Sequence, residues 1–233
     1  MIKIGHSDVI GWEHAIRGMR NSMNSWDKSD SRQTTDPSNE DIVVDKDCAG
    51  LFNFVIGPND QVLMNRLSKL GPDHRKFMRM ITVYMDITAP LYWWKEFDTY
   101  KVGTTANSTS TMHKLASTPI TAECFEIDDY NSDLDYDGTK LGDVIDKHIE
   151  FLESMRVKYL ETKDKAYWKE LIRWLPSAWQ QTRTVTMTYE NLLAMCSKGQ
   201  RRFHKLTEWS KSFIDWARTL PYAQELIFPD ETE

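Results

Sequence analysis

The sequence predicts an α+β protein with a mainly antiparallel sheet and surrounding helices. One observation is the strict alternation of apolar and polar side chains over residues 81–88, which is typical of a half-buried strand. The other is that apolar residues recur at helical spacing in several further segments, with Gly, Pro or acidic residues between them. The 233 residues show no internal repeat and no linker, so we expect residues 1–233 to form a single domain.

The first helix is expected after a short extended segment within residues 1–26. Ser7 or Asp8 is the predicted cap, because either side chain can accept from the free N–H groups of a first turn. The expected buried side of this helix holds four residues: Ile10, His14, Ile16 and Met19. Residues 27–42 are polar and lack periodicity, so we expect a loop there.

A second helix is expected to begin at Pro58, because proline lacks an N–H and suits the first helical position. Its apolar residues are Val62, Leu63, Leu67 and Leu70. Gly71 is expected to end this helix. The predicted strand of residues 81–88 follows, and Pro90 then interrupts the hydrogen-bond ladder and begins a helix.

The stretch after Pro90 is where we expect function. Trp93, Phe97 and Tyr100 share one side of a predicted helix. From Gly103 to Ser110 the chain carries small residues, most of which can form side-chain hydrogen bonds. Because a polar loop beside a rigid strand and helix often binds a ligand, we predict a ligand pocket at this loop.

The second half of the chain is expected to be mainly helical. Residues 125–138 are acidic and are predicted to form a loop. The further predicted elements are four helices and one short strand: helices over residues 141–152, 164–175, 189–196 and 206–216, and the strand over residues 182–185.

Composition argues against two classes of partner. The net charge of −6 disfavours non-specific nucleic-acid binding, which needs a basic surface. No window approaches the length of a membrane span and the first residues do not resemble a signal peptide. We therefore expect a cytoplasmic protein with no nucleic-acid or membrane partner. Cys48, Cys124 and Cys196 are far apart and form no C-x-x-C, so neither a disulfide framework nor a zinc site is indicated.

Common catalytic and nucleotide-binding signatures are missing from the sequence. It contains no G-x-G-x-x-G, no P-loop, no H-E-x-x-H and no G-x-S-x-G. Residues 133–138 match the first half of a calcium loop, D-x-D-x-D-G, but its twelfth position is Val144 instead of a bidentate Glu. This segment is either a calcium loop or a solvated acidic turn, and we expect no strong calcium site.

A basic cluster lies near the start of a predicted helix. Its members are Lys198, Arg201, Arg202, His204 and Lys205. One interpretation is a solvated helix end. The other is a phosphate site, where arginine side chains act together with free backbone N–H groups.

The order of strand, Ala-Pro, helix and polar loop resembles the core of the flavin-dependent thymidylate synthases. In that family a strand and a proline lead into R-Q-W-x-R-H-R and then x-x-S-x-N-E-x-S-x-R-Y. Here residues 95–97 (KEF) stand at Arg-Gln-Trp, residues 99–101 (TYK) at Arg-His-Arg, and Thr104 at the first Ser. His74 matches the first His of the family's upstream H-x-x-P-x-E-H segment.

The resemblance continues after Thr104 with an ambiguity of one residue. Asn107 falls on the family's Glu or on its Asn, and Ser110 falls on its second Ser in one of these registers. Tyr189 and Asn191 fall where the family has Asn and Arg, and Gln200 or Arg201 falls on its final Arg.

The resemblance implies two sets of binding residues, and it identifies no catalytic residue. The implied cofactor-binding residues are His74, Tyr100, Lys101, Thr104 and Asn107. The implied substrate-binding residues are Asn107, Ser108, Ser110, Asn191, Arg201 and Arg202. In the family these two regions meet at one site that different chains of a homotetramer contribute.

The resemblance also implies a function. It predicts an enzyme that uses FAD and transfers a one-carbon unit to C5 of a pyrimidine nucleotide, with NADPH and a folate donor as possible co-reactants. However, most arginines of the signature are replaced here, and Lys101 is a cation retained within it. The alternative is therefore a diverged nucleotide- or flavin-binding protein without synthase activity. A third interpretation is a structural or regulatory subunit with a calcium-dependent loop.

Overall fold

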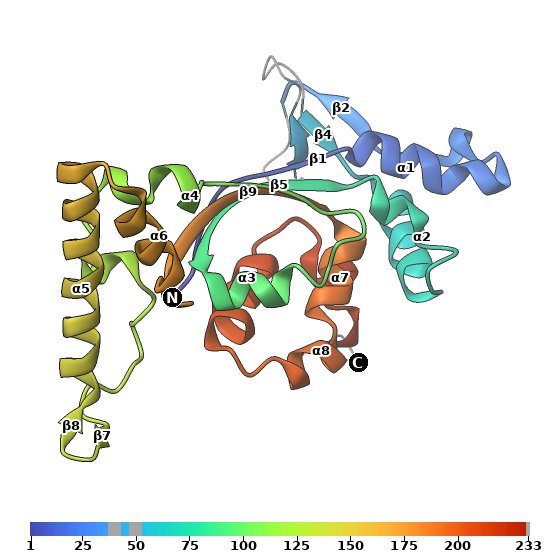
Figure 1. Cartoon of the computed structure of the whole chain (residues 1–233). Helices are drawn as coiled ribbons and strands as arrows, with labels where there is room; N and C mark the ends of the chain where they lie inside the picture. Colours follow the sequence, from blue (N-terminus) through green and yellow to red (C-terminus); the bar gives the residue numbers. More distant parts are fainter. Residues whose placement is uncertain (37–42, 47–52, 232–233) are drawn as a thin grey trace. The chain divides into compact units, whose positions relative to one another are not determined.

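The computed structural model in Figure 1 describes residues 1–36, 43–46 and 53–231, with only the backbone given for residues 43–46, 202 and 203. Helices and antiparallel strands are both present, which confirms the predicted α+β class. The chain divides into two compact units. Unit 1 contains residues 1–3, 87–98 and 107–183, and unit 2 contains residues 4–86, 99–106 and 184–233.

A four-stranded sheet has the order β1-β5-β9-β6. Its strands are β1 (Lys3–Ile10), β5 (Thr82–Pro90), β9 (Gln180–Thr188) and β6 (Thr105–Ser108). The predicted strand at residues 81–88 is confirmed as β5. Val83, Met85 and Ile87 are buried while Tyr84 is exposed, as the alternation in the sequence requires.

The first half of unit 2 combines two helices with a small sheet. Its elements are α1 (Trp12–Arg20), β2 (Arg32–Thr34), β3 (Val43–Lys46), β4 (Asn53–Val55) and α2 (Pro58–Lys69). The small sheet has the antiparallel order β2-β4-β3. The helix predicted to begin at Pro58 is confirmed as α2, although Val62 and Leu70 are exposed.

The first helix was predicted in the right place but with the wrong cap. Ser7 and Asp8 lie in β1, and Gly11 precedes α1 in a left-handed conformation with a φ of 93°. A Cβ at Gly11 would stand 2.3 Å from the carbonyl oxygen of Met80, so only glycine fits this close approach. Of the predicted buried side, Ile16 and Met19 are buried, whereas Ile10 and His14 are exposed.

The second half of unit 2 is helical. Its elements are α7 (Tyr189–Cys196), α8 (Lys198–Phe203), a π-helical segment (Glu208–Phe213), α9 (Ile214–Arg218) and α10 (Ala223–Leu226). The core of unit 2 places the Trp12 ring 5.2 Å from the Tyr189 ring and 5.8 Å from the Tyr222 ring. These aromatic contacts join α1 to α7 and to the start of α10.

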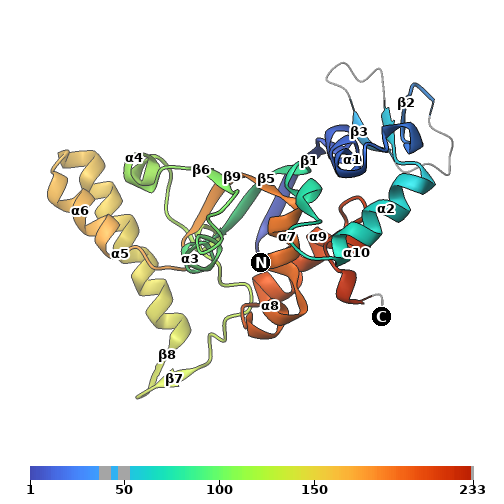
Figure 2. The same cartoon turned by 90° about the vertical axis from the view of Figure 1, so that its right-hand side faces the viewer.

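Unit 1 contains a long helix and a shorter one that lie side by side (Figures 1 and 2). Its elements are α3 (Leu91–Phe97), α4 (Thr111–Lys114), β7 (Asp135–Tyr136), β8 (Thr139–Lys140), α5 (Leu141–Thr162) and α6 (Lys165–Arg173). An apolar core is formed by Leu115, Ile120, Phe125, Leu152 and Leu171. Both helices were predicted, and α5 extends ten residues further than its apolar periodicity indicated.

Three predictions on loops and helix ends were wrong. The polar stretch from Gly103 to Ser110 contains the exposed strand β6. Helix α3 ends at Phe97, so Tyr100 lies outside it. Residues 27–42 contain a helical turn and β2, while residues 37–42 lie outside the described part of the chain. Across the described ranges, no helix has the length and apolar character needed to cross a membrane.

Candidate functional site

The segment Thr99–Thr104, which we call the site loop, holds three predicted cofactor-binding residues in unit 2. The amide nitrogen Nδ2 of Asn191 donates to the carbonyl oxygen of Val102 at 2.6 Å. Within the loop, the hydroxyl of Thr104 donates to the carbonyl oxygen of Tyr100, also at 2.6 Å. Gly103 permits the turn with a φ of 78°. Hydrogen bonds therefore fix the loop at both of these points.

Asn191 holds the site loop because it is itself fixed at the start of α7. Its Oδ1 accepts from the Thr188 hydroxyl at 2.7 Å and from the Thr188 N–H at 3.0 Å. Its own N–H donates back to the Thr188 hydroxyl, completing a capping box. Both ends of the Asn191 amide are thus used within the folded chain, which gives this residue a positioning role.

An aromatic stack continues from the site loop. The Tyr100 ring stacks on Trp209 with centroids 5.6 Å apart, and the His204 ring stacks on Trp209 at 4.1 Å. The Tyr100 hydroxyl lies 3.3 Å from Nε2 of His204. Trp209 is fully buried, so it anchors both polar rings against the core of unit 2. Tyr100 and one member of the predicted basic cluster are therefore in contact within a single chain.

Lys101 is the exposed cation of the site loop. Within the described residues, its ammonium group forms no ion pair and no hydrogen bond. An ammonium group without a partner keeps its full capacity to attract an anion.

Arg201, by contrast, is already paired. Its guanidinium lies 3.1 Å from an oxygen of Asp230 and 3.2 Å from an oxygen of Glu231, and it donates to the carbonyl oxygen of Cys196. The N–H of Lys198 also donates to Asp230. Asp230 therefore accepts from the first N–H of α8, a helix of six residues, and the chain's own carboxylates already contact both Arg201 and this helix end. The Arg202 side chain lies outside the described part.

A second arginine, Arg218, binds the carboxylate of Glu231. Both terminal nitrogens of Arg218 donate to Glu231, at 2.6 and 2.8 Å. These hydrogen bonds lower the pKa of the Glu231 carboxyl from its ordinary value. The carboxylate therefore stays ionised to a lower pH than an ordinary glutamate does.

His74 lies in an exposed turn after α2. The nearby Arg75 and Arg79 both bind Glu190, which stands at the start of α7. Burial would raise the pKa of Glu190, but the hydrogen bonds from Arg79 and Arg75 outweigh this effect and lower it. These two arginines are therefore committed to a structural ion pair.

The remaining predicted site residues belong to unit 1. Asn107 and Ser108 are exposed on β6. Ser110 caps α4, because its hydroxyl accepts from the N–H of His113 at 3.1 Å. The Thr109 carbonyl oxygen accepts from the side chain of Gln181. Asn107 and Ser108 thus keep side chains available to a ligand, whereas Ser110 is partly engaged.

Sequence reasoning missed Arg183 as a candidate. Its guanidinium stacks 4.2 Å from the Trp94 ring and donates to Asp98 at 2.8 Å and to the Gln181 side chain at 3.0 Å. Its partners Trp94 and Asp98 are distant from Arg183 along the chain, so no local pattern connects them. The guanidinium is oriented by three contacts in unit 1.

The acidic segment at residues 133–138 forms part of the β7–β8 hairpin. Lys140 pairs with Asp133 at 3.0 Å, and the N–H of Gly138 donates to Asp135. Asp137 has a φ of 53°, in the left-handed region. No group of three or more metal-ligating side chains gathers anywhere among the residues that the structure describes.

Comparison with solved structures defines the class of fold. A flavin-dependent thymidylate synthase from Helicobacter pylori, complexed with FAD and dUMP, superposes with a TM-score of 0.63 and 14% identity, covering 98% of each chain. A second crystal structure of that enzyme with FAD and dUMP gives 0.62 and 14%, covering 99% of this chain and 98% of that one. The chain therefore has the fold of the flavin-dependent thymidylate synthases.

A further neighbour is a UMP/dUMP methylase from Streptomyces cacaoi, bound with 5-Br dUMP. Its TM-score is 0.57 with 12% identity, and the match covers 98% of this chain and 94% of that one. No protein-family model matches the sequence, and a search of the curated proteins finds no match. At these identities the likeness shows the fold alone.

Proposed function

We propose that this chain is a flavin-dependent enzyme that transfers a one-carbon unit to C5 of a uracil-type nucleotide. The observation that carries the proposal is the site loop, which presents the unpaired cation of Lys101 on a backbone fixed by Asn191. The full-length fold likeness to enzymes crystallised with dUMP supports the same substrate class. The whole chain is proposed to fold as one domain and to assemble as a cytoplasmic homotetramer.

The residues present fit a group that carries phosphate. Lys101 supplies a free positive charge, and the neighbouring hydroxyl of Thr104 would give up its hydrogen bond to the carbonyl oxygen of Tyr100 to donate to a phosphate. We assign FAD binding to these two residues together with Tyr100, His74 and Asn107, and we propose that Lys101 also attracts the phosphate of the pyrimidine nucleotide. A bound flavin supplies the electron transfer that no side chain of this chain can perform, with NADPH and a folate donor as its co-reactants.

The nucleotide is proposed to contact the polar side chains that follow the site loop. Asn107 and Ser108 offer an amide and a hydroxyl on β6, where both are exposed. An amide donor and acceptor can bind a uracil ring or a phosphate oxygen. Ser110, Asn191, Arg201 and Arg202 complete the proposed substrate set, with Asn191 acting through its hold on the site loop.

Release of tritium from dUMP labelled at C5 tests the reaction directly. Purified protein with FAD, NADPH and a methylene folate is expected to release tritium, because transfer to C5 must remove its hydrogen. Protein without FAD is the control. Flavin absorbance in the purified protein would support the cofactor assignment, and absence of both flavin binding and tritium release would contradict the proposed reaction.

Lys101→Ala tests the site itself, through binding. A charge-assisted phosphate contact is worth about 1.5–3 kcal/mol, so the variant should bind dUMP about tenfold or more weakly. Affinity of the wild type should also fall as salt is raised. Lys147→Ala removes an exposed lysine of α5 and is the matched control. Equal affinity of wild type and Lys101→Ala would place the phosphate elsewhere.

A second candidate is a nucleotide- or flavin-binding protein without synthase activity. The observation that favours it is the pairing of Arg201 with Asp230 and Glu231, which occupies the cation expected to contact the pyrimidine nucleotide. Binding of dUMP or FAD without tritium release would favour this candidate over the enzyme.

A further inference from the structure

Unit 2 contains a hollow of about 570 Å³ at the end of α1 and beside α2. None of its lining residues belongs to the site loop. Its lining residues come from α1, the turn that follows it, and α2: Arg20, Met23, Ser25, Lys28, Asn59, Val62, Leu63 and Arg66. Pockets for small ligands usually measure about 300–1,000 Å³, so the hollow is large enough for one.

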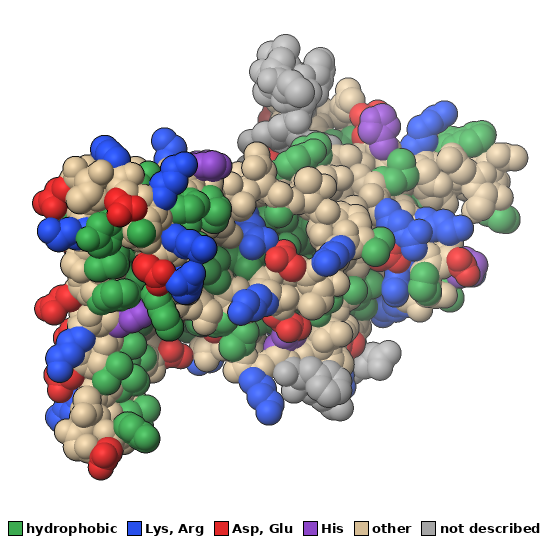
Figure 3. All heavy atoms as spheres, in the orientation of Figure 1, with side chains coloured by type: hydrophobic (Ala, Val, Ile, Leu, Met, Phe, Trp, Pro, Cys, Tyr) green, Lys and Arg blue, Asp and Glu red, His purple; other side chains and the backbone are tan. Residues whose placement is uncertain are grey.

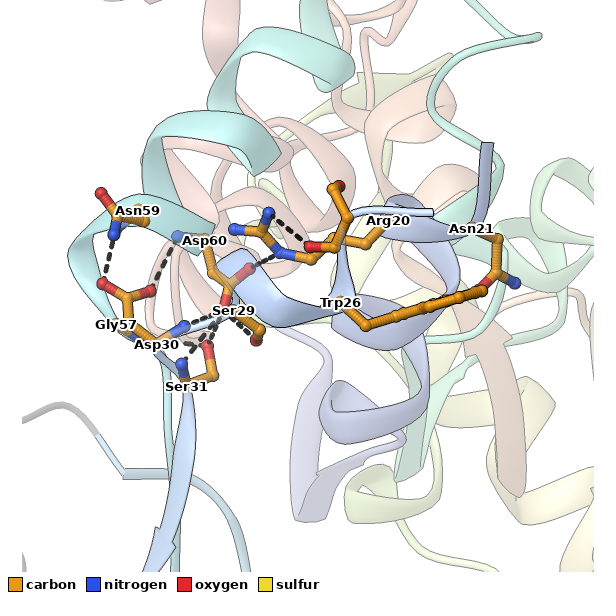
Figure 4. A network of polar contacts seen from close by, with 10 residues as sticks. Arg20, Asn21, Trp26, Ser29, Asp30, Ser31, Gly57, Asn59 and Asp60 are labelled. Carbon is orange, nitrogen blue, oxygen red and sulfur yellow. Dashed lines mark hydrogen bonds and ion pairs between the residues drawn. The ribbon is translucent and has the colours of Figure 1, made fainter. Parts of the chain in front are cut away.

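One wall of this hollow is a buried arginine whose position is fixed (Figure 4). The Arg20 side chain is only 5% exposed. Its Nε donates to Asp60 at 2.5 Å and its Nη1 donates to the carbonyl oxygen of Ser25 at 3.2 Å. Its other terminal nitrogen, Nη2, has no hydrogen-bond partner among the described residues. Arg20 can therefore offer a fixed donor to a ligand in the hollow.

Asp60 keeps Arg20 in this orientation. Asp60 is fully buried, and one of its oxygens accepts from the hydroxyls of Ser29 and Ser31 and from the N–H groups of Asp30 and Ser31. The carboxylate of Asp30 in turn accepts from the first free N–H groups of α2. The N-terminus of α2 is thus already capped. The groups of the hollow that can donate hydrogen bonds to an anion are therefore side chains.

Two further cations line the hollow without a partner. Lys28 and Arg66 are exposed and form no ion pair within the described ranges. None of the described lining residues is acidic, although Asp and Glu outnumber Lys and Arg in the chain, 35 to 29. Lys and Arg side chains gather over α1 and α2 in Figure 3. The lining therefore carries uncompensated positive charge.

The hollow also has an apolar wall. Met23 is 80% exposed and Val62 is 70% exposed, and Leu63 lies beside them in the lining. Exposed apolar side chains next to unpaired cations match a ligand with an anionic end and an apolar body.

We propose that this hollow binds a small phosphate monoester that carries an apolar group. The guanidinium of Arg20, already oriented by Asp60, and the side chains of Lys28 and Arg66 surround the phosphate. Met23 and Val62 contact the apolar group. The site is distinct from the site loop, and its occupancy does not depend on the proposed nucleotide chemistry.

Hexyl phosphate is a suitable probe, measured by titration calorimetry on the full chain. Saturable binding is expected, whereas hexanol lacks the charge and inorganic phosphate lacks the apolar group, so both should bind more weakly. The double variant Lys28→Ala/Arg66→Ala should lose about tenfold or more in affinity. Both positions are exposed, so folding should be preserved. Lys147→Ala/Lys169→Ala removes two exposed lysines of α5 and α6 and serves as the control.

Vesicles then distinguish a lipid headgroup from a free phosphate monoester. Retention on phosphatidylcholine vesicles that contain phosphatidic acid, lost in Lys28→Ala/Arg66→Ala, would identify the phosphate as a lipid headgroup. Binding of hexyl phosphate without retention would identify a free monoester. No saturable binding of hexyl phosphate, or equal affinity in the double variant and the wild type, would overturn the proposal.

Discussion

Asp60→Asn is expected to destabilise the protein strongly, because Asp60 is the buried partner of Arg20. The Asp60 carboxylate is fully buried and lies 2.5 Å from Nε of Arg20, whose side chain is 5% exposed. Removing one partner of a buried ion pair costs about 3–5 kcal/mol, because the other charge stays buried without compensation. The new amide NH₂ would also face hydroxyl and N–H donors from Ser29, Asp30 and Ser31. A loss of this size is a large fraction of a typical domain's stability of about 5–15 kcal/mol.

The effect of Asp60→Asn should depend on pH in one direction. Burial would raise the pKa of Asp60, but hydrogen bonds from Ser29, Ser31 and Arg20 outweigh it, so the folded pKa lies below the ordinary value of 3.8. A carboxyl with a lowered folded pKa stabilises the protein fully above its unfolded pKa. That stabilisation is lost as pH falls through the folded value. The difference between wild type and variant should therefore be largest at neutral pH and shrink below about pH 4.

Urea unfolding followed by tryptophan fluorescence measures this difference, since the chain has nine Trp. Asp146→Asn, at an exposed position of α5, is the matched control and should change the free energy of unfolding by less than about 0.5 kcal/mol. A loss below about 1 kcal/mol for Asp60→Asn, or a loss that stays constant down to about pH 3, would refute the argument.

Three further predictions concern the candidate site and its assembly. Asn191→Ala removes the capping box and the hold on Val102, so thermal unfolding should show a loss of about 1–2 kcal/mol, and dUMP binding should weaken with it. Asn107→Ala changes an exposed side chain, so calorimetry should show weaker dUMP binding while the melting temperature stays nearly unchanged; a large stability loss with unaltered binding would make β6 purely structural. Light scattering should show a homotetramer, and a clean monomer at micromolar concentration would count against a site shared between chains.

The elements predicted best are those whose signal is local. Strand β5 follows directly from alternation, because one face is buried and a shift of one residue would expose all its apolar side chains. The start of helix α2 follows from Pro58, because proline lacks an N–H and its fixed φ suits the first helical position. Neither prediction requires knowledge of which distant residue packs against the element.

The elements predicted worst depend on partners far away in sequence. The cap of α1 is Gly11 because the Met80 carbonyl lies where a side chain would begin, and no local pattern reveals that contact. The stretch after Gly103 consists of small polar residues that favour loops, yet it forms β6. The N–H of Thr109 donates to the carbonyl oxygen of Thr182 just beyond that strand. Pairing with a distant strand outweighs the local preference here.

The candidate site shows the same division. The resemblance located the site loop and Asn191, and the structure joins them through the bond from Asn191 to Val102. Nothing in the sequence indicated the Arg20–Asp60 pair, because a buried ion pair between residues forty positions apart leaves no periodic signal. Residue type alone also could not distinguish a cation that is free from one that is paired.

That difference between cations bears most directly on function. A phosphate at the terminal nitrogen of Arg201 that binds Asp230 and Glu231 would compete with both carboxylates, and Glu231 is also held by Arg218. The affinity gained at Arg201 is therefore reduced by the two carboxylate contacts that are lost. Lys101 has no such contact to lose within the described residues, so it contributes its full attraction to a ligand. A lysine binds phosphate less strongly per contact than an arginine would, because an ammonium group lacks the two-pronged geometry of a guanidinium. An unpaired lysine on a fixed loop nevertheless attracts phosphate better than an arginine that already binds two carboxylates.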